Sequence, residues 1–298
     1  MGKRTLTGAV ILIVTALFVA SRFLSVYFFD AFIMAISFIA CYEVLKAHQK
    51  DERRCSKAYI YLSVVHAFLL YLTYVPFVSK TILQTLLYQL FLAILFFVAS
   101  MITDVVYLNK HKDEEFTADE MLLSTKKLMT IILWPNTLIG TLYGINGFSV
   151  GMGTMILGLV FGVAMATDVF AYLVGSAFHR GKFANQISPK KSLSGAIGGL
   201  FGGIIISVAL YLIFVIGGVY NPFTEVNNTS LILFFVLVGL LGSIATEAGD
   251  LVASSVKRRF EIKDFGKILP GHGGVMDRID GMMFVSAITY ILALIIIV

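Results

Sequence analysis

The sequence predicts an all-α polytopic membrane protein with about nine transmembrane helices, and three observations support this prediction. Hydrophobic residues make up 58% of the 298 residues, while charged residues make up only 14%. Soluble domains usually carry about 25% charged residues. The apolar residues gather in runs of about 20, the length of a helix that crosses a bilayer. These runs are too long and too uniformly apolar for the alternating strands of a membrane barrel, so helices are the expected spans.

Nine apolar runs are expected to form the transmembrane helices, in chain order. They cover residues 6–26, 28–46, 58–79, 82–105, 128–147, 153–177, 195–219, 230–250 and 281–298. The runs divide the chain into an N-terminal transmembrane region, residues 1–127 with about four helices, and a second transmembrane region, residues 128–298. The second region contains two polar, basic loops rich in glycine and proline, at residues 179–194 and 251–280. Loops on a rigid scaffold are where function is usually placed.

The distribution of basic residues predicts the orientation of these helices. Cytoplasmic loops of membrane proteins carry an excess of lysine and arginine. With the N-terminus in the cytoplasm, only Arg22 and Lys80 of the 23 lysine and arginine residues fall on the outer side. We therefore expect a cytoplasmic N-terminus, an outside C-terminus, and both polar loops facing the cytoplasm.

Three carboxylates in and beside the last polar loop form a candidate metal site. Asp250 lies where the eighth span ends, and Asp277 and Asp280 lie where the ninth begins. The last two are three residues apart, so they share a face if the segment is helical. Hard oxygen ligands of this kind suit Mg²⁺, which typically binds one or two carboxylates together with substrate phosphates. Without further context, the alternative is a set of ordinary solvated charges at a membrane interface.

That context comes from a glycine-rich turn and several cations. Residues 270–274 read Pro-Gly-His-Gly-Gly, and glycines allow a ligand to approach the backbone closely. A following helix offers free N–H groups to phosphate. Lys257, Arg258 and Lys263 stand nearby in the sequence. Cations, a glycine turn and paired acids together indicate a site for a metal-bound polyphosphate.

A second polar block precedes the seventh span. Ser188 followed by Pro189 predicts a helix start there, with Lys190 and Lys191 in the first turn. Cations are unfavourable at that end of a helix unless an anion binds there, so this block is a candidate anion site. Asp168 lies inside the sixth span, where a charge is costly and indicates function. Glu43, near the cytoplasmic end of the second span, is assigned no special role.

Both polar blocks resemble one known family. Residues 254–280 are similar, over 27 positions, to the signature of the phosphatidate cytidylyltransferase (CDP-diacylglycerol synthase) family. The matching positions are Ser254, Val256, Lys257, Arg258, Lys263, Asp264, Gly266, Leu269, Pro270, His272, Gly273, Gly274, Val275, Asp277, Arg278, Ile279 and Asp280. The block from Asp168 to Gly199 resembles the second cytoplasmic motif of the family. It departs at Ser194, where the family commonly has a glutamate.

The resemblance implies transfer of a cytidylyl group from CTP to phosphatidic acid, giving CDP-diacylglycerol and pyrophosphate. It makes residues 128–298 the catalytic region and implies Mg²⁺, with K⁺ as a second ion between Asp250 and Asp277. Catalytic roles are expected for Asp250, Asp277, Asp280, Lys257 and Lys263, with the three aspartates as metal ligands. Substrate contacts are expected for Asp168, Tyr172, Lys182, Ser188, Lys190, Lys191, Ser192, Arg258, His272, Gly273, Gly274 and Arg278. The expected partners are CTP, phosphatidic acid, membrane lipids and a second copy of the chain, but no nucleic acid. The expected location is the inner (plasma) membrane.

Two alternatives remain open from the sequence. A related membrane enzyme that uses CTP to phosphorylate a lipid alcohol would share the metal site but release CDP. An ion-coupled transporter would use Asp168 as its coupling acid. Against the transporter, the acids cluster around a cytoplasmic loop, and the two halves show no paired broken spans.

Overall fold

A computed structural model describes residues 2–49, 57–74, 82–110, 134–178, 181, 188, 191–218 and 221–297. The helices of the first half are α1 (Gly2–Ser21), α2 (Val26–Gln49), α3 (Lys57–Tyr74) and α4 (Ile82–Lys110), followed by a helix over residues 134–146. The second half holds α6 (Val150–Phe178), α7 (Leu193–Leu210), α8 (Asn228–Arg259), α9 (Met276–Ile279) and α10 (Met282–Ile296). The chain continues from α7 as one stretch of π-helix, η1 (Tyr211–Ile216). The described residues contain no strand, and the prediction of an all-α fold is confirmed.

Several helices have the length and composition of membrane spans. Four are long and apolar enough to cross a bilayer, at Val26–Ala47, Val150–Phe178, Leu193–Ile216 and Asn228–Arg259. Shorter apolar helices lie at Thr7–Ser21, Tyr59–Tyr74, Leu87–Thr103 and Met282–Ile296. Large hydrophobic side chains stay exposed along these helices, as at Leu17, Phe91 and Ile295. Such a surface suits lipid rather than water, so the chain is a polytopic membrane protein.

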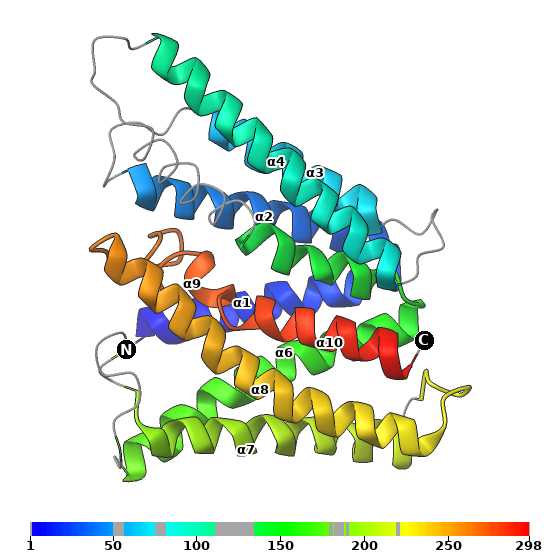
Figure 1. Cartoon of the computed structure of the whole chain (residues 1–298). Coiled ribbons are helices and arrows are strands. Elements are labelled where there is room, and N and C mark those ends of the chain that lie inside the picture. The colour runs from blue at the N-terminus through cyan, green and yellow to red at the C-terminus, as the bar shows by residue number, and fades with distance from the viewer. Residues whose placement is uncertain are drawn as a thin grey trace.

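The helices lie side by side, and the two termini lie at opposite ends of the bundle (Figure 1). The N-terminus lies at the same end of the bundle as the end of α6, the start of α7, and the passage from α8 to α9. We call this end of the bundle the loop end. Both polar loops that the sequence analysis singled out begin or end there.

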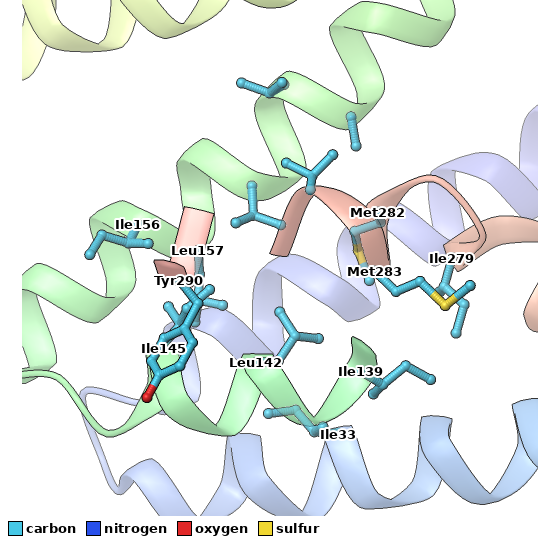
Figure 2. Close-up of a cluster of buried hydrophobic side chains, with 14 of the residues drawn as sticks. Ile33, Ile139, Leu142, Ile145, Ile156, Leu157, Ile279, Met282, Met283 and Tyr290 are labelled. Atoms are coloured by element: carbon cyan, nitrogen blue, oxygen red, sulfur yellow. The ribbon is translucent and has the colours of Figure 1, made fainter. Parts of the chain in front are cut away.

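A buried apolar cluster joins the first and second halves of the chain. Ile33 of α2 and Ile139 and Leu142 of the helix over residues 134–146 face Ile156 of α6 and Met283 of α10, and all are fully or almost fully buried (Figure 2). The same cluster includes a close helix contact, because a Cβ on Gly144 would lie 2.5 Å from the Tyr290 ring. Any larger residue at position 144 would therefore force the Tyr290 ring to shift in a closely packed region.

Small residues bring α6, α7 and α8 into close contact. Gly199 and Gly203 of α7 face these two helices, and a Cβ on Gly203 would overlap the hydroxyl of Ser243. Thr167 of α6 and Ser243 of α8 are hydrogen-bonded at 3.1 Å. Small residues at helix contacts are the usual way for membrane helices to approach closely. Thr167 directly precedes Asp168, so the Thr167–Ser243 hydrogen bond holds this part of α6 beside α8.

Candidate active site

The loop between α8 and α9, residues 260–275, is folded around a tight turn. Leu269 N–H donates to the Gly273 carbonyl at 2.9 Å, and His272 N–H donates back to the Leu269 carbonyl at 2.9 Å. Gly273 has φ +84°, a conformation that glycine adopts readily and other residues avoid. The Pro-Gly-His-Gly-Gly segment therefore forms the turn that the sequence predicted, directly before α9.

Asp277 of α9 ties this loop to the end of α8. Its Oδ2 accepts hydrogen bonds from the backbone N–H groups of Phe265 and Gly274, each at 2.9 Å. Its Oδ1 accepts one from Lys257 Nζ of α8 at 3.0 Å. The side chain is only 2% exposed. Both oxygens are thus occupied by protein donors, and the carboxylate fixes the shape of the loop.

Lys257 also approaches Asp280, which follows α9. The Lys257 Nζ lies 3.9 Å from Asp280 Oδ2, while Asp280 Oδ1 accepts the Gly281 N–H at 2.9 Å. Burial raises the pKa of the Asp280 carboxyl to about 7, and the negative charge of Asp250 adds to this effect while Lys257 opposes it. Asp280 and Asp250 therefore lie close enough to repel one another.

A second lysine is held by two carboxylates of α8. Lys191 Nζ lies 2.5 Å from Glu247 Oε2 and 2.8 Å from Asp250 Oδ2. Burial lowers the pKa of Lys191, but the two carboxylates raise it by more, so its net shift is upward. Glu247 was not identified from the sequence. Its position three residues before Asp250 in an apolar helix was the signal that would have found it.

The start of α7 differs from the prediction. The helix begins at Leu193, with Ser192 as its N-cap, because the Ser192 Oγ accepts the Gly195 N–H at 3.1 Å. The predicted start at Ser188 and Pro189 is therefore wrong. Lys191 precedes the helix instead of lying in its first turn, and the carboxylates of α8 balance its charge. A bound anion is not required to explain this lysine.

Asp168 and Tyr172 extend the cluster along α6. Both are exposed, and Tyr172 is 74% exposed. Asp168 lies within electrostatic range of Asp250, Glu247 and Lys191. The two residues are four apart on a helix, so they share a face. The structure thus brings the sixth-span acid to the same place as the acids of α8.

The remaining expected residues are spread around the loop end. Arg258, Lys263 and Arg278 are exposed, and Ser188 accepts the Lys191 backbone N–H at 3.1 Å. The His272 ring lies against α1, where a Cβ on Gly8 would be 3.7 Å from Nε2. Lys182 and Lys190 lie outside the described residues.

The described residues contain no group of three or more histidine, cysteine, aspartate or glutamate side chains that is arranged to hold a metal ion. Asp250 faces Lys191, while Asp277 and Asp280 face Lys257. The donors are nevertheless carboxylate oxygens, the ligands that Mg²⁺ prefers. Asp250 and Asp280 fit such an ion best, because their two negative charges lie close enough to repel one another and a cation would relieve this repulsion.

One further acid from the first half of the chain reaches the loop. Glu43 of α2 is 3% exposed. Its Oε1 accepts the Val275 N–H at 3.1 Å, and its Oε2 accepts the Met276 N–H at 2.8 Å. Glu43 was expected to have no special role, and its two hydrogen bonds to the start of α9 correct that interpretation.

A bundle of apolar helices with lysine–carboxylate pairs at one end defines an integral membrane protein with a charged site at the end of its helices. The chain belongs to the cytidylyltransferase family, whose model matches residues 2–296. It is 42% identical over 124 residues to a phosphatidate cytidylyltransferase of Thermotoga maritima, covering 42% of this chain and 43% of that protein. It is also similar to proteins of the same name from Brucella abortus, 39% identical over 136 residues (44% of each chain), and from Staphylococcus aureus, 40% identical over 130 residues (44% of this chain, 45% of that protein). The aligned segments thus span less than half the length of these relatives.

Proposed function

We propose that this protein is a phosphatidate cytidylyltransferase. A phosphate oxygen of phosphatidic acid attacks the α-phosphorus of CTP, the bond from that phosphorus to the bridging oxygen of the β-phosphate breaks, and pyrophosphate leaves. The products are CDP-diacylglycerol and pyrophosphate. The observation that carries the proposal is the gathering of Lys191, Lys257, Asp250, Asp277 and Asp280 at the loop end of a membrane bundle. Membership of the cytidylyltransferase family supports it.

The side chains at the loop end suit this reaction. The attacking phosphate is already an anion, so the site needs no general base. It needs positive charge to offset the polyphosphate and groups that align it. Lys191 and Lys257 supply partly buried positive charge, and Arg258, Lys263 and Arg278 are exposed at the same end of the bundle. We assign Lys182, Lys190, Ser188, Ser192, Gly273, Gly274 and His272 to substrate contact, with Asp168 and Tyr172 at the cytidine end or the lipid side.

We propose Asp250, Asp277 and Asp280 as the ligands of Mg²⁺, with K⁺ as a second ion. When bound, the divalent ion neutralises charge that develops on the phosphate oxygens. Asp250 and Asp280 carry most of this role in our proposal. Asp277 would contribute Oδ1 only by exchanging its bond to Lys257, since its Oδ2 holds two backbone N–H groups.

The membrane setting follows from the lipid substrate. Phosphatidic acid keeps its acyl tails in the bilayer, so the enzyme must work at the membrane surface. We propose nine spans, with the loop end in the cytoplasm, where CTP is found. The opposite placement of the two termini supports an odd number of crossings (Figure 1). The proposal includes a homodimer, as the family resemblance implies.

Label transfer tests the proposed reaction. Purified protein in detergent is given phosphatidic acid and CTP labelled at either the α- or the γ-phosphate, with and without Mg²⁺. We expect label from the α-phosphate in the lipid, label from the γ-phosphate in pyrophosphate, and no product without Mg²⁺. A parallel reaction offers diacylglycerol, a lipid alcohol, in place of phosphatidic acid. Label from the γ-phosphate in that lipid, with release of CDP, would instead show a lipid kinase.

A further inference from the structure

We propose that Glu43 of α2 is a positioning residue that holds the α8–α9 loop, residues 260–275, in its active arrangement. The inference rests on the proposed cytidylyl transfer and assigns part of it to a residue of the N-terminal region. Glu43 touches no substrate in this proposal. It acts through the backbone of the loop and through α9.

The first argument is the hydrogen bonding at the start of α9. The first N–H groups of a helix have no partner within the helix. Here Gly274 N–H donates to Asp277, at 2.9 Å, whereas Val275 and Met276 N–H donate to Glu43, at 3.1 and 2.8 Å. Two carboxylates thus satisfy three consecutive donors. One of them comes from α9 itself, and the other comes from a helix more than 200 positions away in the sequence.

The second argument is the space around the Glu43 carboxylate. A Cβ on Gly266 would lie 2.6 Å from its Cδ, and a Cβ on Gly274 would also lie 2.6 Å from it. Real Cβ atoms do not approach other atoms this closely. The carboxylate therefore packs closely against two glycines from separate parts of the loop and links these two parts. Neither glycine has a positive φ, so the close approach to Glu43, rather than backbone conformation, excludes a side chain at these positions.

The third argument is the position of the charged residues relative to this contact. Asp277 follows Met276 directly, and Asp280 lies one turn further. Asp277 binds the same loop at Phe265, one residue before Gly266. A shift of the Glu43 contact would move both aspartates relative to Lys257. A buried acid at this point is costly unless it makes such bonds, which argues that the contact has a purpose beyond packing.

Glu43→Gln is the main test. The amide keeps the size of the side chain but turns one acceptor into a donor, which then faces a backbone N–H group. We expect kcat for CDP-diacylglycerol formation to fall about 10- to 100-fold, the range given by one buried donor left without a partner. The KM for phosphatidic acid should stay within about two-fold, since Glu43 contacts no lipid. Trypsin should cut faster after Lys263 and Lys267, which are exposed in the loop.

Asp30→Asn is the matched control. Asp30 also belongs to α2, about 20 Å away along the helix at 1.5 Å per residue, and its carboxylate accepts a hydrogen bond from Asn146 at 2.7 Å. The same exchange of acid for amide there should leave kcat and the trypsin pattern near those of the wild type. Equal losses in both variants would show a general defect of α2 and overturn the proposal.

A double-mutant cycle keeps the proposal testable if Glu43→Gln does not fold. Gly266→Ala should lower kcat at least 10-fold, because the methyl group displaces the Glu43 carboxylate. In a Glu43→Ala background, the same change should cost less than about three-fold. Additive effects would overturn the inference. If the wild-type protein makes no CDP-diacylglycerol, the proposed function fails, but the trypsin pattern of the variants still decides whether Glu43 holds the loop.

Discussion

Replacing Asp277 with asparagine removes one negative charge from the loop end without changing the volume of the side chain. In the structure, its Oδ1 lies 3.0 Å from Lys257 Nζ, and its Oδ2 accepts two backbone N–H groups at 2.9 Å. Asparagine can still accept the two N–H groups with its oxygen, but its own NH₂ group then faces the Lys257 ammonium. Two donors oppose one another where an ion pair stood.

The size of the effect follows from burial. The Asp277 side chain is 2% exposed and that of Lys257 is 13% exposed. Breaking a buried ion pair by removing one partner costs about 3–5 kcal/mol, and two bonds to a charged acceptor become weaker bonds to a neutral one. If the loop must hold this arrangement for catalysis, kcat/KM should fall roughly 100- to 5,000-fold.

The assay is CTP-dependent labelling of phosphatidic acid in mixed micelles, with the thermal unfolding midpoint measured on the same samples. Glu261→Gln is the control, because Glu261 is exposed in the same loop and loses the same charge. We expect the control to retain the activity of the wild type. If kcat/KM of Asp277→Asn stays within three-fold of the wild-type value, the Asp277 carboxylate does not hold the loop in its active arrangement.

Three further predictions concern other contacts. Glu247→Gln removes one of the two carboxylates that bind Lys191. We therefore expect the KM for CTP, measured from initial rates, to change at least three-fold. An unchanged KM would show that the Lys191–Glu247 pair is not part of the nucleotide site. Asp280 has a raised pKa of about 7, so the folded state holds this proton more tightly than the unfolded chain does. The thermal unfolding midpoint of the metal-free protein should therefore fall as the pH rises from about 4 through 7. Asp280→Asn should remove this dependence of the midpoint on pH. Gly144→Ala places a methyl group 2.5 Å from the Tyr290 ring, and such overpacking should cost about 1–3 kcal/mol; an unchanged unfolding midpoint would contradict the close contact.

The helices were predictable from the sequence because the bilayer fixes their length. Each expected apolar run overlaps a helix of the described structure, and most described ends lie within about five residues of the predicted ones, whereas α8 continues to Arg259, well past the predicted end at residue 250. Such ends depend on local competition that composition does not resolve. Ser188 with Pro189 and Ser192 both have the chemistry of a helix start. The structure places the cap at Ser192, which accepts the Gly195 N–H.

The partners of the charged residues were not predictable in the same way. The sequence identified Asp250, Asp277 and Lys257 by their spacing and family resemblance, but spacing alone does not tell which side chains meet. Asp277 was expected as a metal ligand, and the structure shows it bonded to Lys257 and to two backbone N–H groups.

Glu43 and Glu247 were missed for a physical reason. Each is an acid in a largely apolar helix, and its partner lies in a distant part of the chain: Val275 and Met276 for Glu43, and Lys191 for Glu247. A sequence read from end to end gives no information on which helices touch. The cost of placing an acid in an apolar helix was the available signal, and it indicates a partner without naming it.

The charges at the loop end form two sets, each with one lysine and two carboxylates, and this arrangement has a consequence for the proposed reaction. Lys191 is shared by Glu247 and Asp250, and Lys257 by Asp277 and Asp280. Each lysine therefore sits among more acid than its own charge neutralises. A nucleotide that arrives with a divalent cation brings both signs of charge, so the phosphates can pair with the lysines while the cation pairs with the acids. Neither a bare polyphosphate nor a metal alone satisfies both sets, because each would leave one set without its partner in a partly buried place. Under the proposed function, the arrangement should therefore favour the metal–nucleotide complex over its separate parts, and we expect CTP turnover to depend on Mg²⁺ for this reason.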